Sequence, residues 1–247
     1  MDDAMALNAA KRQLRAAIKN KLRSIPHDAI LSQSAAVRDA LRKLPAYVAA
    51  RRVSIFLSMP HGEIQTDAIV RDALAAGKEV FVPYLHASPT SEPGLPSRVM
   101  DMVRLRDLAD YESLKPDSWG IPSVDPATVD TRQRVLGENG ALLDLVLVPG
   151  VAFDTNSSTG AIRRLGHGKG FYDYFLFRHK VKARELGLQE SPVLLIGLAL
   201  SEQFLAPSEG PVPVGPLDQP LDGLVLGSGE IKGSLARPDE KNIDTTV

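Results

Sequence analysis

Apolar residues recur at helical spacing near the start of the chain. Leu14, Ile18 and Leu22 are each four residues apart, which predicts an amphipathic helix over residues 9–24. A second helical pattern covers about residues 28–43, and a proline follows each of the two segments. The chain therefore begins with two helices, each with one apolar face that must pack against something else.

Short apolar runs alternate with helical segments in most of the remaining chain. Residues 52–58 and 79–85 have the composition of strands, and Thr66 or Asp67 can cap a helix between them that ends at Gly77. A strand, a helix and a strand in about 35 residues form a βαβ unit, which implies parallel strands. Further strands are expected at about 98–105, 144–148, 191–200 and 221–226, with a helix over about 170–184. The pattern predicts an α/β fold with a mainly parallel sheet.

Composition excludes several classes of protein. The 247 residues include 29 basic and 30 acidic side chains, and a net charge of −1 argues against a general nucleic-acid binder. The absence of cysteine excludes disulfides, thiolate zinc sites and cysteine nucleophiles. No apolar run is long enough to span a membrane, and the first ten residues resemble no targeting signal. The composition of residues 231–247 is typical of a disordered polar tail.

The most informative segment is residues 164–173, which read Arg-Leu-Gly-His-Gly-Lys-Gly-Phe-Tyr-Asp before a predicted helix. Three alternating glycines let backbone N–H groups approach a ligand, and a helix N-terminus attracts anions. Lys169 and Arg164 add cations, and Asp173 could hold a metal near a bound phosphate. The spacing matches neither the P-loop nor the dinucleotide-binding pattern. The alternative is a glycine-rich turn whose Asp173 only complements the helix dipole.

Charged residues elsewhere are weaker candidates. Lys11 and Arg15 share one helix face. They either bind phosphate or simply form a solvated basic face. Glu63 follows a predicted strand and is either a binding carboxylate near a cleft or an exposed turn acid. Asp218 could join Asp173 at a metal or belong only to a turn before proline.

The glycine-rich segment, together with Asp144-Leu-Val-Leu-Val-Pro-Gly-Val-Ala-Phe-Asp154, resembles the 5-formyltetrahydrofolate cyclo-ligase family, also called methenyltetrahydrofolate synthetases. Other similar segments follow in the same order between about residues 11 and 225. They are Lys11–Arg15, Ser54–Met59 with Glu63 and Thr66, Gly77–Pro83, Trp119–Pro122, Gly197–Leu200 with Gln203, and Asp218–Val225. The resemblance implies a three-layer α/β/α fold like that of phosphosugar isomerases and CoA transferases. It also implies one domain over residues 9–230, followed by the tail.

The resemblance also implies roles for individual residues. Lys169 and Arg164 would be catalytic, Asp173 and Asp218 would bind Mg²⁺, and ATP would be a co-substrate. The implied ATP-binding residues are Lys11, Arg15, Arg164, Leu165, Gly166, His167, Gly168, Lys169, Gly170, Phe171 and Tyr172. The implied folate-binding residues are Leu57, Glu63, His167, Gly168, Lys169, Gly170 and Phe171.

The implied reaction is the ATP-dependent conversion of 5-formyltetrahydrofolate to 5,10-methenyltetrahydrofolate. We expect a cytoplasmic monomer whose partners are these small molecules, with neither nucleic acid nor membrane. The chain departs from the family pattern at His167, where many members have arginine, at Phe171, a frequent tyrosine, and over residues 154–163, an apparent surface insertion. A folate- or nucleotide-binding protein without turnover is the main alternative. An isomerase or CoA transferase of the same fold would leave Lys11, Arg15 and the two aspartates unexplained.

Overall fold

The computed structural model describes residues 2–88, 97–138, 140, 142–188 and 193–235. The helices are α1 (Asp2–Arg23), α2 (His27–Lys43), α3 (Pro45–Ala49), α4 (Asp67–Ala75), α5 (Leu108–Glu112) and α6 (Phe171–Glu185), with 3₁₀ turns η1 (Pro126–Thr131), η2 (Ser201–Gln203) and η3 (Pro207–Glu209). The strands are β1 (Arg52–Ser54), β2 (Glu79–Ala87), β3 (Arg98–Arg104), β4 (Lys115–Pro116), β5 (Pro122–Ser123), β6 (Leu145–Val148), β7 (Ala152–Thr155), β8 (Ile162–Leu165), β9 (Leu194–Ala199), β10 (Gly223–Leu226) and β11 (Ile231–Gly233).

A seven-stranded sheet in the order β11-β10-β9-β6-β1-β2-β3 forms the centre of the molecule. The five strands from β10 to β2 are parallel to their neighbours, and β11 and β3 pair antiparallel at the two edges. The predicted α/β fold with a mainly parallel sheet is confirmed.

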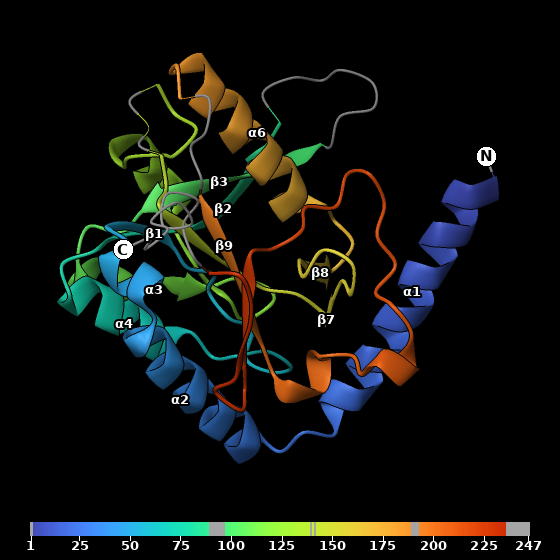
Figure 1. The fold of residues 1–247 in the computed structure, drawn as a ribbon. Helices are drawn as coiled ribbons and strands as arrows, with labels where there is room; N and C mark the ends of the chain where they lie inside the picture. Colours follow the sequence, from blue (N-terminus) through green and yellow to red (C-terminus); the bar gives the residue numbers. More distant parts are fainter. Residues whose placement is uncertain (1, 89–96, 139, 141, 189–192, 236–247) are drawn as a thin grey trace, which may run out of the picture.

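Helices cover both faces of the sheet, which makes three layers. Figure 1 shows α6 on one side of the strands and α2, α3 and α4 on the other. Successive residues of β6 point to opposite faces, so Leu145 belongs to a core with Val37 and Ile69 of α2 and α4, whereas Val146 packs in a second core with Phe175 of α6. The continuous apolar run of β6 follows from this burial on both faces.

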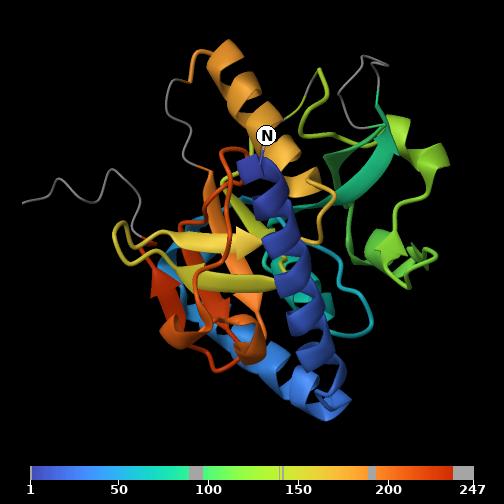
Figure 2. The ribbon, with the colours of Figure 1, turned by 90° about the vertical axis from the view of Figure 1, so that its right-hand side faces the viewer.

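A separate hairpin of β7 and β8 carries the glycine-rich segment. Asp154 and Arg163 are paired across the hairpin by two hydrogen bonds of 2.7 and 2.5 Å, and the intervening turn is largely exposed. Sequence reasoning treated residues 154–163 as a surface insertion and missed the two strands. Helix α1 runs across this hairpin, as Figure 2 shows from the side. The glycine-rich loop therefore follows directly from β8, and α1 packs against the hairpin at β7.

The chain continues in regular structure beyond the last strand expected from the sequence. Strand β11 pairs Ile231 with Val225 of β10, so the expectation of a disordered tail is wrong for residues 231–233. A tight turn at Gly229, whose φ is +84°, returns the chain beside β10. Residues 236–247 lie outside the described residues, and the domain limits at 9 and 230 stay a prediction.

Candidate functional site

The glycine-rich loop joins the end of β8 to the start of α6. Gly168 and Gly170 have φ values of +99° and +68°, which side-chain-bearing residues rarely adopt. Gly170 is the residue that precedes the helix, so the free N–H groups of the first turn of α6 lie beside the loop. Lys169 is exposed, and within the described chain its ammonium makes no hydrogen bond or ion pair. An exposed cation therefore lies next to a helix N-terminus, which is a favourable place for an anion.

Arg164 is buried beneath the loop and holds Asp173. Its Nη2 donates to both carboxylate oxygens of Asp173 at 2.8 and 2.9 Å, and only 4% of its side chain is exposed. The backbone N–H of Gln219 also donates to Asp173 Oδ1, at 3.0 Å. This contact brings Asp173 within one residue of Asp218, although 45 positions separate the two aspartates in the chain. The two predicted aspartates therefore lie on segments that contact each other.

Two cations of α1 reach the same place. Arg15 Nε donates to the carbonyl oxygen of Gly166 at 2.7 Å, and Lys11 forms an ion pair with Asp218. Asp218 Oδ2 also accepts the N–H of Gly215 at 2.5 Å. Partial burial lowers the pKa of Arg15, and the Asp218 carboxylate opposes that shift. The face formed by Lys11 and Arg15 therefore binds the loop and its acidic neighbour, and it is not merely solvated.

Glu63 is a buried acid with little to stabilise its charge. Only 5% of the residue is exposed, and among the described residues its carboxylate accepts one hydrogen bond, from the N–H of Met59 at 2.6 Å. Burial raises the pKa of Glu63 from 4.5 to about 7, and the bond from Met59 opposes that shift only in part. The interpretation of Glu63 as an exposed turn acid is therefore wrong.

Tyr172, in the first turn of α6, is influenced by the charges of both Glu63 and Arg164. Burial raises the pKa of Tyr172, the Glu63 carboxylate raises it further, and Arg164 opposes both. The Tyr172 hydroxyl and Arg164 Nε are buried, and neither has a hydrogen-bond partner in the described part of the protein. Buried polar groups of this kind are uncommon, and a bound ligand is one way to satisfy them.

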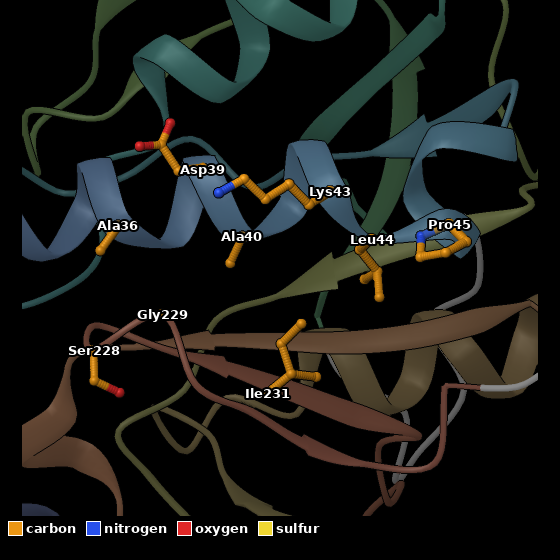
Figure 3. A pocket seen from close by; sticks show the side chains of 9 residues that line it. All are labelled: Ala36, Asp39, Ala40, Lys43, Leu44, Pro45, Ser228, Gly229 and Ile231. Atoms are coloured by element: carbon orange, nitrogen blue, oxygen red, sulfur yellow. The ribbon is translucent and has the colours of Figure 1, made fainter.

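Leu57 belongs to the same buried core as Leu165 of the glycine-rich segment. It lines a pocket of about 220 Å³ with Pro60, Tyr111 and Gly120, and no loop residue contributes to that pocket. A more open pocket of about 500 Å³ lies between α2 and the turn before β11, as Figure 3 shows. Its only charged side chains are Asp39 and Lys43, and it contains none of the predicted site residues. The predicted site residues therefore lie elsewhere than this pocket, and most of them lie at or beside the glycine-rich loop.

The comparisons with known proteins identify the family. A model of the 5-formyltetrahydrofolate cyclo-ligase family matches residues 7–227, which is most of the chain. The chain belongs to this family. It is 34% identical to the 5-formyltetrahydrofolate cyclo-ligase of Saccharomyces cerevisiae, over 90% of this chain and 98% of the yeast protein. It is also 34% identical to the enzyme of that name from Mus musculus, over 90% of this chain and 96% of the mouse protein.

A solved cyclo-ligase-like structure has the same fold. The 5,10-methenyltetrahydrofolate synthetase of Aquifex aeolicus superposes with a TM-score of 0.62 at 23% identity, over 92% of this chain and 94% of that one. The family resemblance expected from the glycine-rich loop is confirmed. No helix in the described ranges is long and apolar enough to cross a membrane.

The two aspartates suit a metal that is shared with a ligand. Among the described residues, no group of three or more His, Asp or Glu side chains could hold a metal ion by itself. Asp173 and Asp218 together fit Mg²⁺, which typically binds one or two carboxylates and takes its other oxygens from phosphates and water. The free Oδ1 of Asp218 accepts no hydrogen bond from the described residues, so it is available as a ligand.

His167, which stands where many family members have arginine, has a lowered pKa. Desolvation lowers the pKa of its imidazole, and the neighbouring cations Lys19, Arg164 and Arg15 lower it further. The ring is therefore neutral near pH 7, and the loop lacks a cation at this position.

Sequence reasoning also missed two contacts that build the site. These are the N–H of Gln219 on Asp173 and the N–H of Met59 on Glu63. Both donors are backbone groups, which leave no signal in residue type.

Proposed function

We propose that this protein is a 5-formyltetrahydrofolate cyclo-ligase, which uses ATP to convert 5-formyltetrahydrofolate to 5,10-methenyltetrahydrofolate. The observation that carries the proposal is the convergence of α1, the glycine-rich loop and the Asp218 segment, which together present cations and free N–H groups suited to phosphate. Family membership supports the reaction, because relatives that cover nearly the same length of chain carry that name.

The chemistry requires activation of a poor electrophile. The formyl oxygen attacks the γ-phosphorus of ATP, and ADP leaves. Nitrogen N10 of the folate then attacks the activated formyl carbon and loses its proton, and phosphate departs with the former formyl oxygen. No protein nucleophile is needed, so the protein must mainly position the two substrates and stabilise charge.

The loop and α1 supply the groups for the nucleotide. Lys169 is free to follow the γ-phosphoryl group during transfer, since nothing in the described structure holds its ammonium. The N–H groups at the start of α6 and the guanidinium of Arg15 face the same region. Arg164 acts from below by fixing Asp173. A bound Mg²⁺ would neutralise phosphate charge beside Asp173 and Asp218.

Glu63 and Leu57 are the folate-side residues of the proposal. A carboxylate that lies buried with one backbone donor can accept further N–H groups from a pterin ring, and such bonds would lower its raised pKa. Arg164 lies over the Tyr172 ring at 5.9 Å, and the Glu63 carboxylate raises the pKa of the Tyr172 hydroxyl. Both observations support a folate site next to the phosphate site.

A phosphate measurement separates turnover from binding. Purified protein is incubated with 5-formyltetrahydrofolate, ATP and Mg²⁺, and free phosphate is measured beside folate consumed. We expect one phosphate per folate, and none when either substrate is left out. ATP binding without folate-dependent phosphate release would identify a binding protein instead.

A cytoplasmic location and a monomeric state stay predictions, because a 27% identical relative from Arabidopsis thaliana is named mitochondrial and the chain is described alone.

A further inference from the structure

Each carboxylate of the proposed metal site already has a cationic partner. Arg164 pairs with Asp173, and Lys11 pairs with Asp218. In the ligand-free protein both aspartates are therefore already neutralised by side chains of the protein. A divalent cation that binds these aspartates must therefore either share each carboxylate with a cation of the protein or displace that cation.

The two pairs differ in how readily they can open. Arg164 is 4% exposed, binds Asp173 through two bonds, and also donates to Pro149 O at 3.3 Å, so its departure would leave a buried charge without a partner. Lys11 lies on the surface helix α1, and 13% of its side chain is exposed, against 24% for Asp218. Its flexible stem can carry the ammonium elsewhere at small cost.

The Lys11 ammonium could also pair with phosphate groups bound at the glycine-rich loop. Arg15, one helical turn further along α1, is held against the loop through Gly166 O at 2.7 Å. Lys11 shares that face of α1, so phosphate groups at the loop would lie within reach of both cations.

We propose that Lys11 and the divalent cation compete for Asp218, so that nucleotide phosphates release the aspartate by drawing Lys11 away. This inference rests on the proposed function, because it needs phosphate at the loop and a metal at Asp173 and Asp218. ATP and metal then bind cooperatively, since the ligand that takes Lys11 increases the affinity of the ligand that takes Asp218. Lys11 is thus a positioning residue that keeps the metal site closed until ATP arrives.

Metal binding without nucleotide tests the exchange directly. Mn²⁺ serves as the probe, and its free concentration is followed by electron paramagnetic resonance during titration of the protein. Lys11→Met should bind Mn²⁺ about tenfold more tightly than the wild type, because a charge-assisted hydrogen bond no longer competes. Lys11→Gln, which keeps a polar side chain, should shift affinity in the same direction. Circular dichroism confirms that each variant is folded.

Lys21 provides a matched control on the same helix. Its ammonium lies 4.0 Å from the Glu209 carboxylate, in an exposed ion pair that also joins α1 to the chain before Asp218. Lys21→Met should leave Mn²⁺ affinity unchanged, and Asp218→Asn should remove the gain when it is combined with Lys11→Met. Equal Mn²⁺ affinity in the wild type and both Lys11 variants would overturn the exchange. If the wild type still forms methenyl product, that result leaves the proposed function intact, whereas failure to form product would refute the function itself.

Discussion

Glu63 gives the sharpest prediction about the folate side of the site. Its carboxyl has a raised pKa because it is buried with a single backbone donor. The folded protein therefore keeps the proton of Glu63 to a higher pH than the unfolded chain does. Stability contributed by the protonated acid is present at low pH and is lost as the pH rises from about 4.5 to about 7. The substitution Glu63→Gln should remove this dependence.

The size of the effect follows from the two pKa values. For a shift from 4.5 to about 7, the free energy of unfolding of the wild type should fall by about 2.5 kcal/mol between pH 5 and pH 8 through this group alone. The amide of glutamine does not titrate, and it can still accept the N–H of Met59. Any fixed cost of burying the amide is the same at both pH values and cancels in the comparison.

Urea unfolding at pH 5 and pH 8 measures the difference. We expect Glu63→Gln to gain about 2.5 kcal/mol relative to the wild type between the two pH values. The control is Glu138→Gln, at an exposed acid, which should change the difference by less than about 0.5 kcal/mol. A difference for Glu63→Gln as small as that of the control would refute the buried, weakly stabilised carboxylate.

Three further predictions concern the loop. Lys169→Ala should lower turnover about 100- to 1,000-fold with the protein still folded, and near-normal turnover would remove Lys169 from catalysis. His167→Arg should lower the KM for ATP several-fold at pH 7, by a ratio that stays constant from pH 6 to 8, because the lowered pKa keeps the wild-type imidazole neutral there; a wild-type KM that falls to the variant's value at pH 6 would contradict this. Gly168→Ala and Gly160→Ala both place alanine at positive φ and should each cost about 1 kcal/mol of stability. Only Gly168→Ala should also lose activity, since its methyl group would lie 3.2 Å from the guanidinium carbon of Arg15; equal activity of the two variants would argue against this contact.

The pattern of apolar residues predicted the main elements because burial decides them. The run of β6 is buried on both faces, and the apolar positions of α2 face one core. The first strand was expected over residues 52–58 but ends at Ser54. Ile55 still donates its N–H to Phe81 of β2, and Ile55, Phe56 and Leu57 stay buried without forming further strand structure. A run of hydrophobic residues indicates burial, but it does not distinguish a hydrogen-bonded strand from a buried loop.

The site was predicted as a set of residues but not as a set of contacts. The glycine spacing and the resemblance it supports indicated the loop, the two cations of α1 and the two aspartates. The pairing of Arg164 with Asp173, and of Lys11 with Asp218, depends on how β8, α6 and the Asp218 segment meet in space. Contacts between segments up to 207 positions apart follow from tertiary packing, which local patterns do not encode.

Absorbance of the methenyl product tests the central claim most directly. Purified protein is mixed with 5-formyltetrahydrofolate and Mg²⁺, and the methenyl chromophore is followed before and after ATP is added. We expect the chromophore to appear only after ATP is added and at a rate proportional to protein concentration. A folded protein that binds ATP yet produces no chromophore would contradict it.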